Sequence, residues 1–176
     1  MKIALDAGHG GTDPGAVGPN GLAEAPTVLT ICKALDELLQ GYGWSTLLTR
    51  KTEVFISLGT RCEIANDWGA TYFVSVHANS NGPDAHGIET LYKTEKGKAL
   101  AEPIQKALIV ATKERDRGLK HRTDLHVLNA TRMPACLVEI GFISHPATEK
   151  QLLEPDYLTL LADAIALGLK NFIEPT

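Results

Sequence analysis

The sequence has few cysteines, no long apolar segment and no block of like charge. Its three cysteines are far apart and form no Cys-x-x-Cys pair, so a metal ion held by cysteine is not expected. Each one stands among apolar neighbours, which indicates buried free thiols at Cys32, Cys62 and Cys136. No apolar run approaches the roughly 18–20 residues of a membrane span, so membrane insertion is not expected either.

The charge balance makes two classes of partner improbable. The chain carries 17 Lys and Arg against 21 Asp and Glu, a net charge of −4, without a long run of either sign. Nucleic acids and anionic membrane surfaces both select a basic face, so we expect neither as a partner.

The N-terminal segment "MKIALDAGHG" contains Asp6 soon after a single lysine and has no apolar core of a signal peptide. We therefore expect either a protein that leaves the cytosol by another route or a fragment whose signal or companion domains lie outside this sequence.

The length and the order of elements predict one α/β domain over residues 1–176. A chain of 176 residues with 44% apolar side chains is sized for one buried core. Apolar runs predict strands at residues 2–7, 45–50, 72–78, 88–92, 125–129 and 135–142. Helical spacing predicts helices at residues 26–40, 57–68, 95–114 and 156–173, and the charged segment 115–124 is expected to be a loop. This alternation is typical of an open, mostly parallel sheet of about six strands with helices on both faces.

Four polar residues do not fit their apolar surroundings. His9 ends the first strand between glycines, and His77 ends the most apolar strand. Glu24 extends the apolar stripe of the first helix, four positions before Val28, and Glu139 is the one charge in "CLVEIGF". Sites in open α/β sheets gather at the carboxyl ends of strands, where both histidines fall. Two imidazoles and a carboxylate are a common ligand set for Zn²⁺.

Each of these residues also has a structural explanation. A histidine at a strand end is often hydrogen-bonded within the fold, and Glu24 suits a helix N-terminus whatever its role. Glu139 can pair with a buried arginine, which would offset the cost of burying its charge. No His-Glu-x-x-His or similar local motif gathers the candidates, so from the residues alone a metal site is one hypothesis among these.

Two other interpretations of the stretch "LDAGHGGTDPGA" fail. A dinucleotide loop beginning at Gly8 needs glycine at position 13, where Asp13 would repel a pyrophosphate, and Pro14 follows in place of a helix. The chain has no G-x-x-x-x-G-K-[ST] and no G-x-S-x-G motif. We expect neither nucleotide binding nor a serine nucleophile.

The motifs resemble, in order and over essentially the whole chain, those of the zinc-dependent N-acetylmuramoyl-L-alanine amidases of the amidase-3 type. They are "LDAGHGGTDPGAVG", "GLAEAPTVLTICKAL", "LTR", "RCEIAN", "FVSVHANS", "GIETLY", "DRGLK" and "LHVLNATRMPACLVEIGFIS". That family includes bacterial cell-wall hydrolases and phage endolysins. The resemblance implies hydrolysis, at the bacterial cell wall, of the peptidoglycan amide bond between N-acetylmuramic acid and L-alanine.

The resemblance also implies roles for the four polar residues. His9, Glu24 and His77 would bind one Zn²⁺, which lowers the pKa of a bound water to about 7. Glu139 would be the catalytic acid/base, taking a proton from that water and passing it to the departing alanine nitrogen.

Other matched positions carry weaker expectations. Asn79, next to the "HAN" histidine, and His126 are expected as substrate contacts, with a structural role as the alternative for His126. In "RCEIAN", Arg61 and Asn66 are expected to support the fold.

The chain departs from the usual family pattern at a few positions, which bear on preference for the stem peptide and not on the metal centre: Pro26, Val28, Asn129 and His145. No insertion corresponds to the helix that blocks the site in some cell-separation members, so we expect an open enzyme. The expected partner is peptidoglycan, bound by a monomer, with any wall-binding domain outside this chain.

Two alternative functions remain at this stage. One is a zinc peptidase that cuts within the stem peptide. The other is a non-enzymatic wall-binding module, which the presence of all four polar residues disfavours because a binder has no need of Glu139 in an apolar strand.

Overall fold

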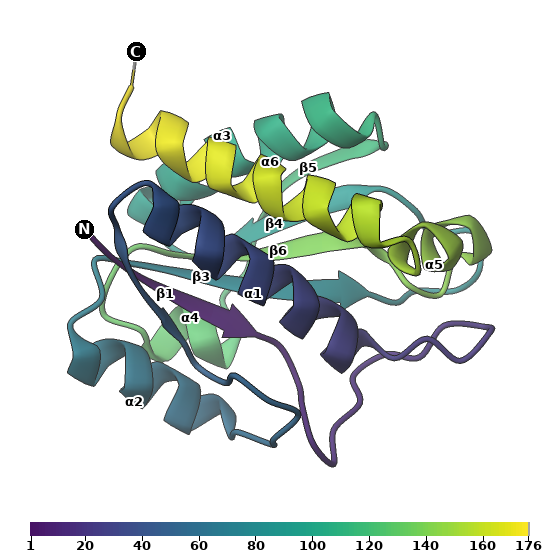
Figure 1. The fold of residues 1–176 in the computed structure, drawn as a ribbon, viewed down its shortest axis with the longest axis horizontal. Helices are drawn as coiled ribbons and strands as arrows, with labels where there is room; N and C mark the ends of the chain where they lie inside the picture. The colour runs from purple at the N-terminus through teal and green to yellow at the C-terminus, as the bar shows by residue number, and fades with distance from the viewer. Residues whose placement is uncertain (176) are drawn as a thin grey trace.

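The computed structural model describes residues 1–175, which form a six-stranded sheet between two layers of helices (Figure 1). The strands are β1 (Lys2–Ala7), β2 (Ser45–Leu48), β3 (Tyr72–Asn79), β4 (Ile88–Tyr92), β5 (Asp116–His121) and β6 (Ala135–Phe142). Their order is β2-β1-β3-β6-β4-β5, and every neighbouring pair is parallel except β4 with β6. The predicted α/β class with a mostly parallel sheet is confirmed.

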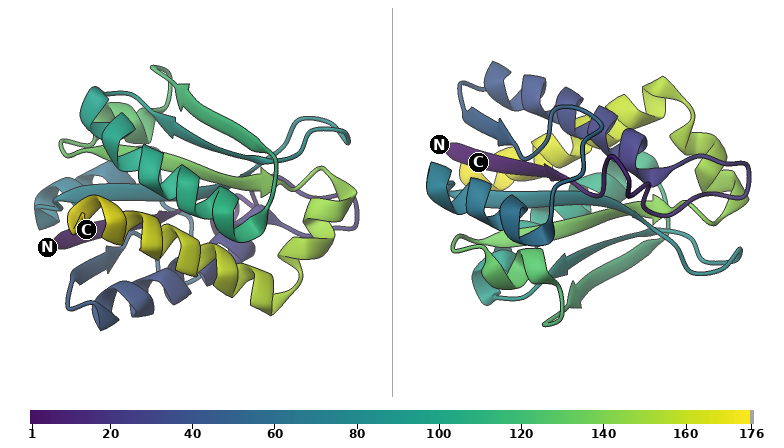
Figure 2. Two further views of the ribbon diagram at one scale, coloured as in Figure 1. Left: turned by 90° about the horizontal axis from the view of Figure 1, so that it is seen from above. Right: turned by 90° about the horizontal axis from the view of Figure 1, so that it is seen from below.

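The helices cover both faces of this sheet, as predicted. The face with the larger core is covered by α1 (Glu24–Gly41), α3 (Glu95–Thr112) and α6 (Pro155–Ile173). The opposite face carries two shorter helices, α2 (Leu58–Trp68) and α4 (His126–Ala130), and α5 (Pro146–Leu152) lies at the end of the sheet (Figures 1 and 2). Alternate residues of the central strands enter the two cores, so that Val74 faces the first layer and Phe73 the second.

The two short helices cover only one end of their face. Under them the strands bury apolar side chains, at Ala4, Phe73, Leu91, Ala135 and Leu137. Further along, the register places polar residues of the same face side by side, at Asp6, Ser75, His77, Glu89 and Glu139. In the right panel of Figure 2, α2 and α4 lie at one end of the strands, and the opposite strand ends have no helix over them. The carboxyl ends of β1, β3 and β6 are therefore available for a site.

One predicted strand is wrong. The segment "LHVLN" at residues 125–129 forms α4, where the backbone N–H of Asn129 donates to the Leu125 carbonyl. The segment has too few apolar residues for their spacing to distinguish a helix from a strand. The adjacent side chains of Val127 and Leu128 are both buried in the core beside α2, which a helical turn permits and a half-buried strand does not.

The charged segment 115–124 is not wholly a loop, because it contains β5. This strand lies at the edge of the sheet and pairs only with β4, and its two ends are exposed. Charged side chains are common on edge strands, where they discourage pairing with another chain. Helix α5 was also not predicted from the sequence. The other predicted elements agree with those observed to within a few residues.

The cysteines and the helices bear on two further expectations. All three cysteines are buried and free, as predicted, and burial raises the pKa of Cys62 to about 11 and that of Cys136 to about 12. Within residues 1–175, no helix combines the length and the apolar character that crossing a bilayer requires.

Candidate metal centre and active site

Three of the predicted residues meet at the carboxyl ends of β1 and β3. His9 follows β1, His77 lies in β3, and Glu24 is the first residue of α1. The His9 Nε2 atom lies 3.3 Å from Glu24 Oε2, and the His77 Nδ1 atom lies 2.9 Å from Glu24 Oε1. The potential ligand atoms of the three side chains all lie within 4.8 Å of one another. Two ring nitrogens thus face a single carboxylate.

The carboxylate of Glu24 is held in place by backbone as well as by the histidines. The Ala16 N–H donates to Oε2 and the Ala78 N–H donates to Oε1, each at 2.9 Å. Burial alone would raise the pKa of Glu24, but hydrogen bonds with His77 and His9 outweigh burial and hold that pKa well below its usual range. Glu24 therefore stays ionised, as a metal ligand must.

The His9 imidazole is oriented from both sides. Its backbone is in the left-handed region, with φ of 58°, and its Nδ1 atom lies 2.8 Å from Asp13 Oδ2. The hydrogen bond with Glu24 raises the pKa of His9 to about 9, with a smaller contribution from Asp13 against the opposing effect of burial. Metal-binding histidines commonly hydrogen-bond a carboxylate through the ring nitrogen that does not bind the metal, as His9 does here with Asp13. Asp13 was not predicted as a partner of His9, and its place four residues after His9 was the available signal.

Two glycines leave the space that this cluster occupies. A methyl group at Gly8 would lie 2.2 Å from Cε1 of His77. A methyl group at Gly15, where φ is +69°, would lie 2.7 Å from both Glu24 Oε2 and the His9 ring. The glycine-rich stretch around His9 is therefore required by close packing of the three side chains.

Glu139 lies directly beside this cluster on the same face. It is paired in register with His77 across β3 and β6. Its Oε2 atom is buried and has no hydrogen-bond partner within residues 1–175, and burial raises the pKa of Glu139 to about 7. The alternative of a buried arginine partner is not observed among the described residues, whose ion pairs do not include Glu139.

Glu89 is a further residue of this face that the sequence analysis did not identify. It lies opposite Glu139 in the antiparallel pair of β4 and β6. The Arg117 Nε atom donates to Glu89 Oε2 at 2.7 Å, and Asn79 Nδ2 donates to Oε1 at 3.2 Å. Asn79 is thus held by Glu89 at the end of β3. The signal was the same as for Glu139, a carboxylate in a strand of apolar neighbours, "IETLY".

A cleft of about 360 Å³ opens beside the cluster and extends to α4. His9 and His77 lie along it, and so does the exposed His126 at the start of α4. The apolar part of its wall comes from the loop before α2 and the first residue of that helix, from the start of α4 and the residue before it, and from β6, at Phe55, Ile56, Leu58, Leu125, Val127 and Leu137. A substrate can therefore approach the two histidines from solvent.

Asn66 connects two parts of the fold, in line with the structural role expected for it. Its Nδ2 atom donates to the Ala130 carbonyl and its Oδ1 atom accepts from the Arg132 N–H, each at 2.9 Å. These bonds join α2 to the segment around α4. Arg61 does more than support α2, because its guanidinium reaches Asp6 and the end of β1.

The sequence and the fold identify the family. The family described as N-acetylmuramoyl-L-alanine amidase matches residues 3–171. The chain belongs to this amidase family. The sporulation-specific N-acetylmuramoyl-L-alanine amidase of Bacillus subtilis is 38% identical over 182 residues, which cover 97% of this chain and 68% of that protein.

Solved structures of N-acetylmuramoyl-L-alanine amidases have the same fold. AmiC2 of Nostoc punctiforme is 36% identical with a TM-score of 0.95, covering 99% of this chain and 97% of that one. The catalytic domain of CwlV from Bacillus (Paenibacillus) polymyxa is 33% identical with a TM-score of 0.95, covering 100% and 99% of the two chains. The amidase fold therefore extends over essentially the whole chain.

The packing of Gly8 against the His77 ring gives a first prediction. Gly8→Ala should displace that ring and, if this cluster holds a metal ion such as zinc, weaken its binding about tenfold or more, because the direction of the His77 nitrogen is lost. Gly59→Ala, in α2 with only a side-chain oxygen 4.0 Å from the added carbon, is the matched control and should leave affinity unchanged. Zinc affinity is measured by competition with a chromophoric chelator. Equal affinity in both variants would contradict the packing argument.

The pKa of His9 predicts how the metal-free amidase responds to pH. Its pKa of about 9 in the folded state, against about 6.5 when unfolded, means that the folded protein binds this proton more tightly. The resulting stabilisation is complete below about pH 6.5 and is lost as the pH rises through 9. The free energy of unfolding in urea, with chelator present, should fall by roughly 2–3 kcal/mol across that window. His9→Gln should flatten the profile, and a wild-type profile that does not fall would refute the assignment.

Proposed function

We propose that this chain hydrolyses the peptidoglycan amide bond between N-acetylmuramic acid and L-alanine, with Zn²⁺ held by His9, Glu24 and His77. The chain is an N-acetylmuramoyl-L-alanine amidase, and peptidoglycan at the bacterial cell wall is its substrate. The observation that carries the proposed mechanism is the ligand cluster beside Glu139, a buried carboxylate with an unpartnered oxygen. All four side chains come from one chain, which supports action as a monomer and a single catalytic domain over residues 1–176.

The donor set fits zinc. Two imidazoles and one carboxylate are the ligands of many catalytic zinc sites, and buried thiols elsewhere in the chain are not needed. The carboxylate of Glu24 is fixed by two backbone N–H groups, and Asp13 accepts from the far nitrogen of His9 when that nitrogen carries its proton. Bound there, Zn²⁺ supplies Lewis acidity, which polarises the amide carbonyl and makes the attacking water a stronger acid.

Glu139 moves the proton in this mechanism. Its Oε2 atom has no competing partner and takes a proton from the attacking water as the new carbon–oxygen bond forms. The same oxygen then donates that proton to the alanine nitrogen as the carbon–nitrogen bond breaks. A pKa near 7 suits both halves, because a group titrating near the working pH accepts and releases a proton with similar ease.

The surroundings of the site support substrate contacts. His126 lines the cleft beside His9 and His77, within reach of a chain lying along it. Asn79 ends β3 two residues after His77, and its amide is bonded to Glu89. We assign both residues to substrate contact, His126 from the wall of the cleft and Asn79 from the end of β3.

Exchanging each carboxylate for its amide separates the two proposed roles. Glu139→Gln keeps shape and should keep zinc, but it cannot shuttle a proton, so hydrolysis should fall about 10²- to 10⁴-fold, or roughly 3–5 kcal/mol of barrier. Glu24→Gln should instead lose zinc, because a neutral amide is a poorer ligand. Zinc content and hydrolysis of purified walls are measured on the same preparations. Loss of zinc from Glu139→Gln with retention in Glu24→Gln would exchange the two roles.

The products of digestion test the bond that is cleaved. Purified walls should release peptides with free L-alanine N-termini and leave glycan strands intact, with no new reducing ends. A strong chelator should stop the release and added Zn²⁺ should restore it. New N-termini at other stem residues would favour the alternative of a zinc peptidase, and release that is unaffected by chelation would overturn the zinc proposal. Amino-group labelling and mass spectrometry of the soluble fraction distinguish these outcomes.

A further inference from the structure

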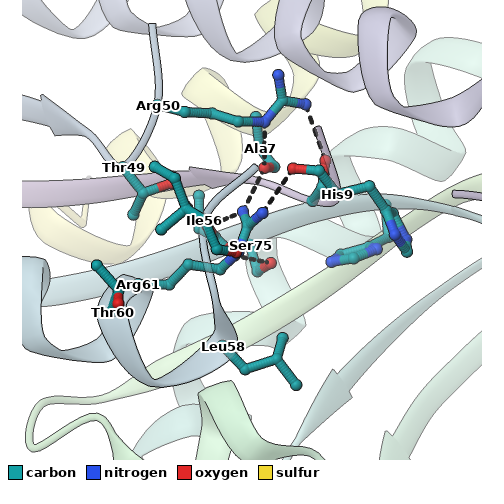
Figure 3. Close-up of polar contacts among 12 residues, drawn as sticks. Ala7, His9, Thr49, Arg50, Ile56, Leu58, Thr60, Arg61 and Ser75 are labelled. Carbon is teal, nitrogen blue, oxygen red and sulfur yellow. Dashed lines mark hydrogen bonds and ion pairs between the residues drawn. The ribbon is translucent and has the colours of Figure 1, made fainter. Parts of the chain in front are cut away.

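Two buried arginines bind consecutive carbonyl oxygens at the point where β1 leaves the sheet. The Ala7 oxygen accepts from Arg50 Nε at 3.0 Å and from Arg61 Nη1 at 2.6 Å. The Gly8 oxygen accepts from Arg50 Nη2 at 2.8 Å, and the His9 oxygen accepts from Arg61 Nη2. Figure 3 shows the two guanidinium groups on opposite sides of this segment. We call Arg50 and Arg61 the carbonyl clamp.

The clamp fixes the backbone dihedral angles of His9. The peptide plane before His9 contains the Gly8 oxygen, and the plane after it contains the His9 oxygen. Arg50 holds the first plane and Arg61 the second, so together they restrict φ and ψ of this residue. His9 is in the left-handed region, which is unfavourable for a residue with a side chain and persists only where surrounding contacts impose it.

Arg50 also joins the backbone of two ligands. Its Nη2 atom donates to the Gly8 oxygen and, at 2.7 Å, to the Ala25 oxygen. Gly8 precedes His9 in the sequence and Ala25 follows Glu24, so one nitrogen sets the spacing between the two segments. The Gly8 N–H donates to the Val76 oxygen at 3.1 Å. Val76 precedes His77, so the backbone beside the third proposed ligand is connected to the same segment.

The environment of the clamp shows that its bonds are costly to remove. The Arg50 side chain is fully buried and that of Arg61 is 3% exposed. Asp6, also buried, accepts from Arg61 at 2.8 Å and is itself held by Thr49 and Ser75. A lysine in either place keeps the charge but lacks the planar set of donors that reaches several carbonyls at once.

We propose that Arg50 and Arg61 are positioning residues for the metal site, which set the direction of the His9 imidazole toward Glu24 and thereby the affinity for zinc. This inference rests on the proposed function, because it takes His9 and Glu24 as zinc ligands. The hydrogen bonds of the clamp reach backbone carbonyls and the carboxylates of Asp6 and Glu53, and none reaches the side chain of a proposed ligand. Arg61 also lies along the cleft, but the proposed effect on zinc acts through the backbone beside the ligands.

The test compares Arg50→Lys and Arg61→Lys with a control that destabilises the fold elsewhere. Asn66→Ala removes two hydrogen bonds between α2 and the α4 segment and has no bond to residues 6–9. Zinc dissociation constants of the folded, metal-free proteins are measured by chelator competition, and thermal unfolding is followed in parallel. Both lysine variants should bind zinc 10- to 100-fold more weakly, the range typical for partners that orient metal ligands. Asn66→Ala should lose thermal stability with an unchanged zinc constant.

A lysine variant that unfolds without metal is measured in sucrose, which favours the compact state. Ser75→Ala provides a milder second variant, because it frees one oxygen of the carboxylate that holds Arg61. It should weaken zinc binding several-fold, and by less than Arg61→Lys. Lysine variants and Ser75→Ala that lose thermal stability but bind zinc like the wild type would overturn the positioning role. A wild-type protein that fails to bind zinc would instead overturn the proposed metal site, so the two failures are distinguishable.

Discussion

The site depends on the hydrogen bonds that the Glu24 carboxylate accepts. Each of its oxygens receives one imidazole and one backbone N–H, from segments that are distant in the sequence. Four donors on two oxygens compensate for removing this charge from water, which would otherwise be strongly unfavourable. The same four contacts fix where the loop after β1, the start of α1 and the end of β3 lie relative to one another. The proposed metal ligation and the local folding therefore rely on one group.

The position of the site follows from the lengths of two helices. On the face covered by α2 and α4, the strands change from apolar to polar residues where the helices end. Polar side chains at that end remain accessible without leaving the sheet, which holds their backbone rigidly. His77 and Glu139 are consequently adjacent through strand register alone, whereas His9 lies beyond its strand and needs the clamp of Arg50 and Arg61.

Sequence periodicity was enough to predict five of the six strands and the four longest helices, and it identified His77 and Glu139 as polar residues in apolar strands. Their convergence with Glu24 was implied by the family resemblance, since no local motif gathers residues 9, 24, 77 and 139. Arg50 and Glu89 were missed because their partners lie in other elements and become neighbours only through the sheet. Short or edge segments such as α4 and β5 were mistaken because tertiary contacts, and not local pattern, decide their state.

Two glutamates of the site, one at the start of α1 and one in β6, acquire different chemistry from their surroundings. Glu24 accepts hydrogen bonds from two histidines and two backbone groups, so its pKa falls despite burial. Glu139 has a buried oxygen with no donor, and burial together with the nearby charges of Glu24 and Glu89 raises its pKa to about 7. Environments that separate the pKa values of paired carboxylates distinguish a permanently charged group from a proton carrier. Glu24 thus keeps the fixed negative charge that the proposed metal site requires, and Glu139 has the unpartnered oxygen and the pKa that the proposed proton transfer requires.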